Sequence, residues 1–246
     1  SGQVLFKTVL EKSLFSSPAA CLATIRQRLA KLEKDGSAEA ARDRGQREDL
    51  AADVSAIGPT RFTQYGKLLE VLRSKVGLDW TGDRADDRLV VFTERIETLR
   101  FIEAQLKKDL RLKDKQVAVL HGASGSDVEL QQVVEAFGRD KEPVRLLIAT
   151  DIASEGLNLH FLCHKMVHFD IPWSLMVFQQ RNGRIDRYGQ PREPHIAYFY
   201  TESKHEKIRG DARILELLIQ KDEQAAKNIG DPSVFMGVFD EREEEL

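Results

Sequence analysis

The sequence is poor in features that would mark a secreted, metal-binding or membrane protein. Only two cysteines, Cys21 and Cys163, occur among its 246 residues. They are too few and too far apart for a metal cluster or a disulfide framework, so we expect both thiols to be packing residues. The sequence contains no apolar stretch long enough to span a bilayer and no signal-peptide pattern. These absences favour a cytosolic protein.

A strong charge of one sign is also missing. Lysine and arginine total 37 and aspartate and glutamate total 40, for a formal net charge of −3. The composition therefore carries no overall electrostatic signature of nucleic-acid binding, although a local groove would need only a few basic residues. Basic clusters occur at 26–34 and 107–115. Such clusters are usually solvated helix faces, and a DNA-contact role for either is an alternative that the salt dependence of binding would test.

Two motifs that hold a nucleoside triphosphate are absent from the chain. There is no GxxxxGK[ST] phosphate loop, and no DExx box follows a strand. Without a lysine-bearing loop and a metal-holding acid, we expect this chain alone to be unable to hold Mg-ATP and orient an attacking water. The chain begins without methionine and within a helical pattern, so we expect it to be an excised fragment.

Short apolar segments alternate with amphipathic segments over most of the chain. Strands are predicted near 89–93, 117–121, 145–149, 166–170 and 195–200, and helices near 96–108, 127–138 and 175–187. This alternation predicts an α/β fold with a parallel sheet covered on both faces. Ligands on such sheets bind outside the carboxyl ends of the strands. Thr150, Asp151, Asp170 and the pair His121-Gly122 all follow predicted strand ends.

The segment 179–190, QQRNGRIDRYGQ, is the most informative part of the chain. Arg184 and Arg187 are three residues apart, and residues at that spacing share one face of a helix. Arginine stays charged, and its planar fork matches phosphate oxygens. The pair therefore favours a grip on a triphosphate, or on charge that develops during phosphoryl transfer. A solvated helix face is the alternative.

The same segment resembles the last conserved motif of superfamily 2 helicases, QRxGRxxR. Its ending, Tyr188-Gly189-Gln190, narrows the resemblance to the Swi/Snf-type ATPases. Most Swi/Snf-type proteins place a histidine before the final arginine, whereas this chain has Asp186 there. Bacterial RapA-like ATPases share the aspartate, and the pattern is most similar to theirs.

Upstream segments resemble other motifs of the superfamily in the expected order. Residues 146–159, LLIATDIASEGLNL, resemble the fifth motif. Residues 89–99, LVVFTERIETL, resemble the fourth motif, and His121-Gly122 ends a strand as in the family. Residues 166–174, MVHFDIPWS, resemble a Swi/Snf-type strand that ends in aspartate and precedes a tryptophan.

The resemblance implies a role for individual residues. Two of them, Arg184 and Arg187, correspond to arginine fingers on the γ-phosphate of ATP. The other residues that the resemblance places at the nucleotide are Gln180, Asp151, Gly156 and Asn158. The residues that it places at nucleic acid are Thr150, on the phosphate backbone, with His121 and Gly122. It assigns no metal ligand to this chain.

Taken together, the motifs imply the second RecA-like half of a two-domain DNA translocase. ATP and Mg²⁺ would be held mainly by a first RecA-like domain that is missing here, and the fragment alone would be inactive. Swi/Snf-type relatives typically move along duplex DNA and remodel or displace bound proteins. The implied partners are DNA, the first RecA-like domain, and RNA polymerase or another DNA-bound protein, at the nucleoid in a bacterial cytoplasm.

Two alternatives remain open. A strand-separating DNA or RNA helicase belongs to the same superfamily, and a pin hairpin between the fifth and last motifs would favour it; the spacing from Leu159 to Gln179 leaves little room for one. A non-catalytic nucleic-acid- or protein-binding module is the other alternative. The presence of both Arg184 and Arg187 counts against that module, because a decayed site has no need for them.

The predicted organisation has three parts. Residues 1–80 form a helical lead-in, 81–203 the RecA-like motor domain, and 204–246 a C-terminal helix and acidic tail. Within the lead-in, the charged segment 34–53 is either a mobile loop or an exposed helix. Helical periodicity returns at 208–227, and the last segment, 240–245, has five acids in six residues.

Overall fold

A five-stranded parallel sheet forms the centre of the molecule. The computed structural model describes residues 2–34, 37–122, 125–151, 158–205, 208 and 210–230. Its strands lie in the order β2-β3-β1-β4-β5, and each neighbouring pair is parallel. The strands are β1 (Arg88–Phe92), β2 (Val117–Leu120), β3 (Leu146–Ala149), β4 (Cys163–His168) and β5 (His195–Tyr198). The predicted parallel sheet is confirmed, and each strand overlaps its predicted segment.

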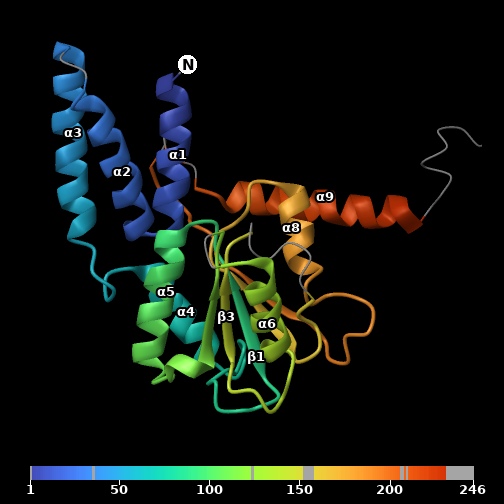
Figure 1. The fold of residues 1–246 in the computed structure, drawn as a ribbon. Helices are drawn as coiled ribbons and strands as arrows, with labels where there is room; N and C mark the ends of the chain where they lie inside the picture. The colour runs from blue at the N-terminus through green and yellow to red at the C-terminus, as the bar shows by residue number, and fades with distance from the viewer. Residues whose placement is uncertain are drawn as a thin grey trace, which may run out of the picture.

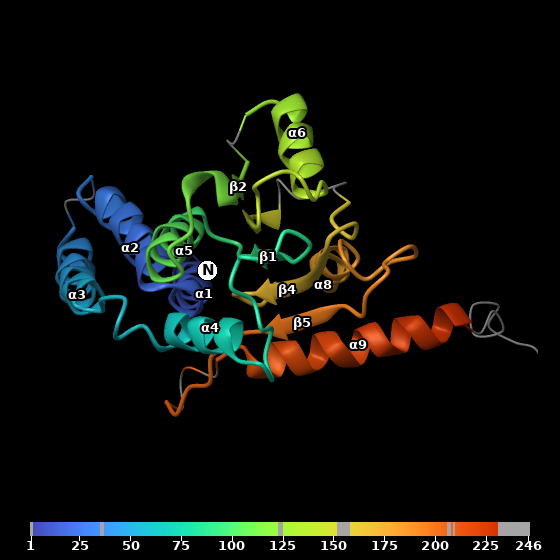
Figure 2. The ribbon, with the colours of Figure 1, turned by 90° about the horizontal axis from the view of Figure 1, so that it is seen from below.

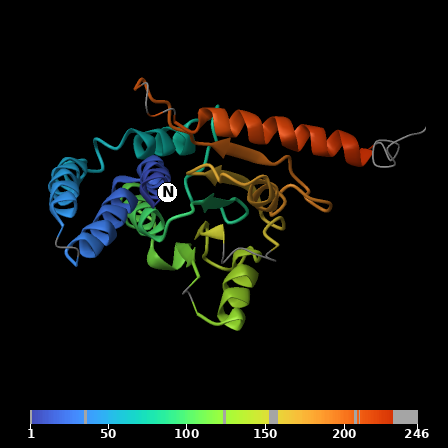
Figure 3. The ribbon, with the colours of Figure 1, turned by 90° about the horizontal axis from the view of Figure 1, so that it is seen from above.

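Helices cover both faces of the sheet, as Figure 2 and Figure 3 show from opposite ends. On one face lie α4 (Thr63–Arg73) and α5 (Ile96–Asp109). On the other lie α6 (Asp127–Phe137) and α8 (Leu175–Asn182). This arrangement confirms the predicted α/β fold with a parallel sheet covered on both sides.

The central strand β1 supplies both cores. Leu89 and Val91 pack in the core that contains α4 and α5, whereas Val90 and Phe92 pack in the core that contains α6. None of these four side chains has exposed surface, and burying each stabilises the fold by about 1.5–3 kcal/mol. A parallel strand covered on both faces needs apolar residues at successive positions, which explains the unbroken LVVF run.

A buried arginine, Arg88, lies at the N-terminal end of β1. Arg88 has no exposed surface, and its guanidinium donates to the carbonyl oxygens of Phe137, Arg139 and Glu142 at 3.2, 2.7 and 3.1 Å. These carbonyls lie at and beyond the C-terminal end of α6, where a positive charge is favourable. Burial lowers the pKa of Arg88 to about 10. The motif patterns of the sequence did not indicate this contact.

Part of the predicted lead-in packs into the core of the sheet. Tyr65, Leu68 and Leu72 of α4 join the same core cluster as Trp80 and β1. The Trp80 indole also donates to the carbonyl oxygen of Asp87 at 3.1 Å. The segment from α4 to Trp80 is therefore held against the sheet, while the division of the chain at residue 80 stays a prediction.

Three N-terminal helices stand together at one end of the sheet (Figure 1). They are α1 (Gly2–Ser16), α2 (Pro18–Leu32) and α3 (Ala38–Ser55). A small core of Cys21, Ile25 and Val54 joins α2 and α3. Of the two alternatives for the charged segment 34–53, the helix holds for the described residues of α3. Ser37 caps this helix through a bond from the backbone nitrogen of Ala40 at 3.1 Å.

The chain ends its described part in a long helix, α9 (Ala212–Gly230). Its first half packs Leu215 and Leu218 against Phe178 of α8, and its second half extends beyond the body of the molecule (Figure 1). The helix begins later than the predicted residue 208, because Gly210 takes the left-handed conformation at φ 68° and Asp211 bonds back to Thr201. The predicted acidic tail, 240–245, lies outside the described residues.

Among the helices of the described part, none combines the length and the apolarity that a bilayer span requires. Both cysteines are free and buried. Burial raises the pKa of the Cys21 thiol to about 11 and that of Cys163 to about 12. Thiols of this kind are poor nucleophiles at neutral pH, in agreement with their predicted role as packing residues.

Candidate functional site

The residues that follow four strands meet at the carboxyl edge of the sheet. Thr150, after β3, donates its backbone N–H to the carbonyl oxygen of Leu120 at the end of β2, at 2.9 Å. Thr93, after β1, donates in the same way to Ala149, at 3.1 Å. Asp170, two residues after β4, accepts from Thr93 Oγ1 at 2.5 Å. The predicted gathering of polar residues at this edge is therefore present.

Arg181 is the centre of the site. Its Nε donates to Asp151 Oδ1 at 2.5 Å and its Nη2 to Asp151 Oδ2 at 2.9 Å, a bidentate pair of the strong kind. Nη1 donates to the carbonyl oxygen of Asp170 at 3.0 Å. The guanidinium also lies over the Phe92 ring, 5.5 Å from its centroid. One arginine thus joins α8 to the ends of β1, β3 and β4.

The charge of Arg181 is maintained in spite of complete burial. Burial alone would lower the pKa of this side chain, which is 1% exposed. The hydrogen bond and charge of Asp151, with the charge of Asp170, outweigh that effect and raise the pKa. A buried charge is stable only when it is paired and hydrogen-bonded, and Arg181 satisfies both conditions.

His168 is an uncharged side chain that lies beside Arg181. Burial, together with the nearby Arg181 charge, lowers its pKa well below the ordinary value. Because the Arg181 guanidinium has no acceptor, Nδ1 of His168 accepts from Nη1 of Arg181, 3.4 Å away. Nε2 therefore carries the proton and donates to Asn182 Oδ1 at 2.9 Å. The ring is fixed in one tautomer by its two neighbours from α8.

Asp170 is a second point where several elements meet. Its Oδ2 accepts from Thr93 and also from Ser16 Oγ of α1, at 2.6 Å. Its Oδ1 accepts from the backbone nitrogen of Glu94 at 2.9 Å and lies 3.7 Å from Nη2 of Arg181. Asp170 therefore joins the N-terminal helices to the centre of the site.

Sequence reasoning did not assign a role to Arg181, although it lies inside the last-motif segment. A signal was present: Arg181 is three residues after Phe178, and both are buried on one face of α8. A charged residue on an otherwise apolar helix face indicates a buried partner. Ser16 carried no such signal, because its contact with Asp170 joins residues 154 positions apart.

The predicted helix over 175–187 was too long. Helix α8 ends at Asn182, and Arg184 and Arg187 lie in the turns that follow. Ile185 is fully buried and anchors these turns. The two arginines therefore do not share a helix face, and the turns rather than a helix determine where they point.

The Gly-Gln ending of the motif closes this turn structure. Gly189 adopts the left-handed conformation at φ 91°, which glycine takes without a Cβ penalty. The Gln190 amide then donates to the carbonyl oxygens of Cys163 and Ile185 at 2.9 and 3.0 Å. These bonds tie the end of the arginine segment to the beginning of β4.

The fifth-motif and last-motif segments also touch outside the Arg181–Asp151 pair. Arg187 is exposed, and its guanidinium donates to Asn158 Oδ1. The backbone nitrogen of Leu159 donates to the carbonyl oxygen of Arg184 at 3.2 Å. The structure therefore brings together Arg187 and Asn158, two residues predicted to lie at the nucleotide. Their roles there stay predictions.

The remaining predicted residues differ in accessibility. Gln180 is exposed on α8, and Gly122 is exposed after β2. Nε2 of His121 accepts from the Arg100 guanidinium at 2.7 Å. Thr150 is 4% exposed, and its hydroxyl has no hydrogen-bond partner within the described part of the chain. Gly156 lies outside the described residues.

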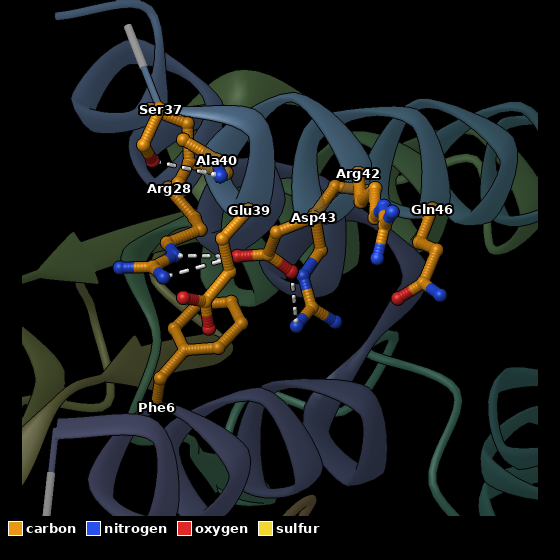
Figure 4. Close-up of a pocket in the computed structure, with 10 residues that line it drawn as sticks. Phe6, Arg28, Ser37, Glu39, Ala40, Arg42, Asp43 and Gln46 are labelled. Carbon is orange, nitrogen blue, oxygen red and sulfur yellow. Dashed lines mark hydrogen bonds and ion pairs between the residues drawn. The ribbon is translucent and has the colours of Figure 1, made fainter. Parts of the chain in front are cut away.

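A cavity of about 560 Å³ lies elsewhere, between α1, α2 and α3 (Figure 4). Asp43 bonds Arg28 at 3.0 Å and Arg47 at 2.9 Å. Both guanidiniums lie over the Phe6 ring, 5.3 and 4.8 Å from its centroid. Because these charges pair with one another, we assign the cavity to the packing of the helices and not to the site.

Within the described residues, no three His, Cys, Asp or Glu side chains form a group that could hold a metal ion. The polar groups that converge at the carboxyl edge are instead arginines, carboxylates and hydroxyls.

Fold and site together define an α/β domain of the RecA-like class, with an arginine-rich segment at the carboxyl edge of its sheet. The helicase conserved C-terminal domain family matches residues 67–189, half of the chain. The chain belongs to this family. The match contains all nine residues that the sequence predicted for the site.

Curated relatives agree with this assignment. The chain is 28% identical over 224 residues to the uncharacterized ATP-dependent helicase YqhH of Bacillus subtilis, covering 90% of this chain and 35% of that protein. It is 32% identical over 123 residues to the RNA polymerase-associated protein RapA of Pectobacterium carotovorum, covering 50% of this chain and 12% of that protein. The predicted resemblance to RapA-like proteins is confirmed. The chain spans only about a third and about an eighth of these two relatives.

A solved structure shows the same fold. The helicase domain of Pyrococcus furiosus Hef covers 78% of this chain with a TM-score of 0.50, and the chain covers 37% of that structure. Sequence identity is 19%, so the comparison concerns the fold alone.

Proposed function

We propose that this chain is the second motor half of an ATP-dependent Swi/Snf-type DNA translocase. ATP and Mg²⁺ would be held mainly by a first RecA-like domain elsewhere in the same polypeptide. The observation that carries the proposal is that two arginines of one motif have different environments. Arg181 is buried and paired with Asp151, whereas Arg187 is exposed and held by Asn158.

The available groups suit a triphosphate. Arg187 presents a guanidinium at the surface, and a single hydrogen bond to a neutral amide leaves its charge uncompensated by Asn158. Arg184 is half-buried beside it. When bound, ATP would supply the phosphoryl group that is transferred to water. Arg184 and Arg187 would stabilise the charge on that group, and Gln180 and Asp151 would orient the surrounding network.

The bonds between segments explain how such arginines could be presented. Arg181 fixes α8 against the ends of the strands, and Gln190 fixes the end of the turns to β4. The turns between them carry Arg184 and Arg187. Because bonds at both ends support these turns, the arginines would be preorganised when the two motor halves close.

The nucleic-acid side of the proposal uses the neighbouring strand ends. Thr150, His121 and Gly122 follow β3 and β2, which are adjacent in the sheet. A hydroxyl and backbone N–H groups suit phosphate oxygens, which proteins contact without reading base sequence. We propose duplex DNA as the substrate. One relative, RapA, is an RNA polymerase-associated protein, so RNA polymerase or another DNA-bound protein is the proposed client, at the bacterial nucleoid.

The connection between the two motif segments favours translocation over strand separation. Residues 158–182 are all described, and the regular elements among them are β4 and α8. This interval therefore contains no β-hairpin that could act as a pin between two nucleic-acid strands. A helicase that separates strands would need a wedge from another part of its chain.

The test uses the longer polypeptide with both motor halves. Arg187→Ala should reduce DNA-stimulated ATP turnover by about 10³-fold or more, the usual effect of losing an arginine finger, with little change in ATP affinity. Arg192→Ala is the matched control, because Arg192 lies nearby but pairs with Asp86 at 2.6 Å. Unchanged turnover in the Arg187 variant would disprove the finger assignment. Measurable turnover by the 246-residue chain alone would disprove the half-motor proposal.

A further inference from the structure

A chain of hydroxyl groups connects the N-terminal helices to the arginine site. Ser17, the N-cap of α2, accepts from the backbone nitrogen of Ala20 at 3.0 Å. Ser17 Oγ lies 2.6 Å from Thr98 Oγ1 of α5, which lies 2.7 Å from Ser16 Oγ. Ser16 then donates to Asp170 Oδ2 at 2.6 Å. The three hydroxyl side chains and the Asp170 carboxylate of this series are all buried.

The direction of these bonds follows from the number of protons. Each hydroxyl has one proton to donate. Because Ser16 gives its proton to Asp170, Thr98 must donate to Ser16, and Ser17 must donate to Thr98. The series therefore runs from the positive N-terminal end of α2 to a carboxylate, and bonds that point in one direction strengthen one another.

The series continues from Asp170 to the centre of the site. Asp170 contacts Arg181 through its carbonyl oxygen at 3.0 Å and its carboxylate at 3.7 Å. Arg181 in turn holds Asp151 with two bonds. A displacement of the α1–α2 junction would therefore be transmitted to Asp151 through two side chains, Asp170 and Arg181.

A second contact holds the same part of α1. Lys12 Nζ forms an ion pair with Glu94 at 3.0 Å and lies over the Trp173 ring, 5.0 Å from its centroid. The backbone nitrogen of Glu94 donates to Asp170. Two independent groups on α1, one turn apart, thus converge on the residues that surround Asp170.

We propose that Ser16 and Thr98 are positioning residues, through which the α1–α2 junction sets the orientation of Arg181 and Asp151. The catalytic part of this inference rests on the proposed function, because it treats the Arg181–Asp151 pair as part of an ATP site. An interface that served only for packing could use apolar side chains of similar shape at little cost. Hydroxyls aimed at the carboxylate beside Arg181 instead connect the helices to the site.

The first test uses the 246-residue chain and the Nε–H signal of Arg181 in ¹⁵N nuclear magnetic resonance spectra. Ser16→Ala should shift this signal and speed its exchange with water by about tenfold, the factor expected for one lost hydrogen bond to a charged group. Ser13→Ala is the matched control. Ser13 is equally buried, one turn earlier on α1, and its Oγ bonds to Leu10 and the Cys21 thiol instead of to Asp170.

A second pair of variants covers the case in which Ser16→Ala fails to fold. Thr98→Val keeps the shape of the side chain and removes the hydroxyl, and Thr24→Val, on α2, is its control. The proposal requires Thr98→Val to change the Arg181 signal and Thr24→Val to leave it in place. An unchanged signal in both Ser16→Ala and Thr98→Val, or an equal change in the controls, would overturn it.

The second test measures DNA-stimulated ATP turnover in the polypeptide with both motor halves. Ser16→Ala should lower kcat by about tenfold with KM for ATP unchanged, while Ser13→Ala retains wild-type kcat. Equal losses in both variants would indicate a merely structural role and overturn the positioning assignment. Absence of turnover in the wild type would instead count against the proposed function, and the spectroscopic test would still decide whether the junction orients Arg181.

Discussion

Arg181 of α8 and Asp151, which follows β3, form a bidentate ion pair at 2.5 and 2.9 Å. The arginine is 1% exposed and the aspartate 25% exposed, so the pair lies at the boundary between core and solvent. One partner belongs to the last conserved motif and the other to the fifth. Their bond therefore joins the two motif segments at the carboxyl edge of the sheet.

Replacement of Arg181 should be costly to stability. Arg181→Met removes the partner of Asp151 and leaves the Asp170 carboxylate without a neighbouring positive charge, which we expect to destabilise the fold by about 3–5 kcal/mol. Urea unfolding of the 246-residue chain measures this loss. Arg192→Met should cost less than about 1 kcal/mol, because its partner is an exposed aspartate. Similar losses for the two variants would contradict the central role of Arg181.

Buried His168 should make stability depend on pH. Its pKa is lowered in the folded protein by burial and by Arg181, so the unfolded chain binds the proton more readily. Stability from this group is therefore complete above about pH 6.5 and is lost as the pH falls below that value, by up to about 1.4 kcal/mol per pH unit.

The measurement is the free energy of unfolding between pH 7.5 and 5.5. His168→Gln should flatten its dependence on pH. His164, whose pKa burial lowers to about 4, adds a slope of the same sign that the variant retains. An equally steep slope in the His168 variant would exclude this residue as a source.

Asp211 should contribute in the opposite direction. Burial raises its pKa from 3.8 to about 6, so the folded state binds the proton more readily, and the stability from this group is lost as the pH rises from about 4 through 6. Asp211→Asn keeps an acceptor for the backbone nitrogen of Thr201. We expect it to stabilise the protein by about 1 kcal/mol at pH 8 and to have little effect at pH 4. Thermal unfolding at the two pH values provides the comparison, and equal shifts at both would refute it.

Two glycines should respond to alanine in opposite ways. Gly189 has φ 91°, a conformation that side chains rarely adopt, so Gly189→Ala should destabilise the protein by about 1–2 kcal/mol. Gly66 lies within α4 with no atom within 4 Å of an added Cβ, and Gly66→Ala should stabilise it by about 0.5–1 kcal/mol. Urea unfolding of both variants tests the signs. A neutral effect at Gly189 would mean that its turn can relax.

The fold was predictable because its signals are local. Strands such as 146–149 have apolar residues at successive positions, and the alternation of strands with amphipathic helices implies a parallel sheet. The motif segments could be recognised in the same way, since each lies within about a dozen residues. Element ends were less predictable: α8 stops at Asn182 because the following turns are held by contacts with β4, which is distant in sequence.

The sequence by itself determined the α/β class, the order of the strands along the chain and the position of the arginine segment. Only the tertiary structure decided which arginine is buried. Arg181, Arg184 and Arg187 are chemically identical, and their accessibility depends on partners that come from other elements. Asp151, Asp170 and His168 surround Arg181, while Arg187 reaches Asn158 at the surface. The same reason placed Ser16 beside Asp170: burial and pairing are properties of the assembled fold and not of neighbouring residues in the chain.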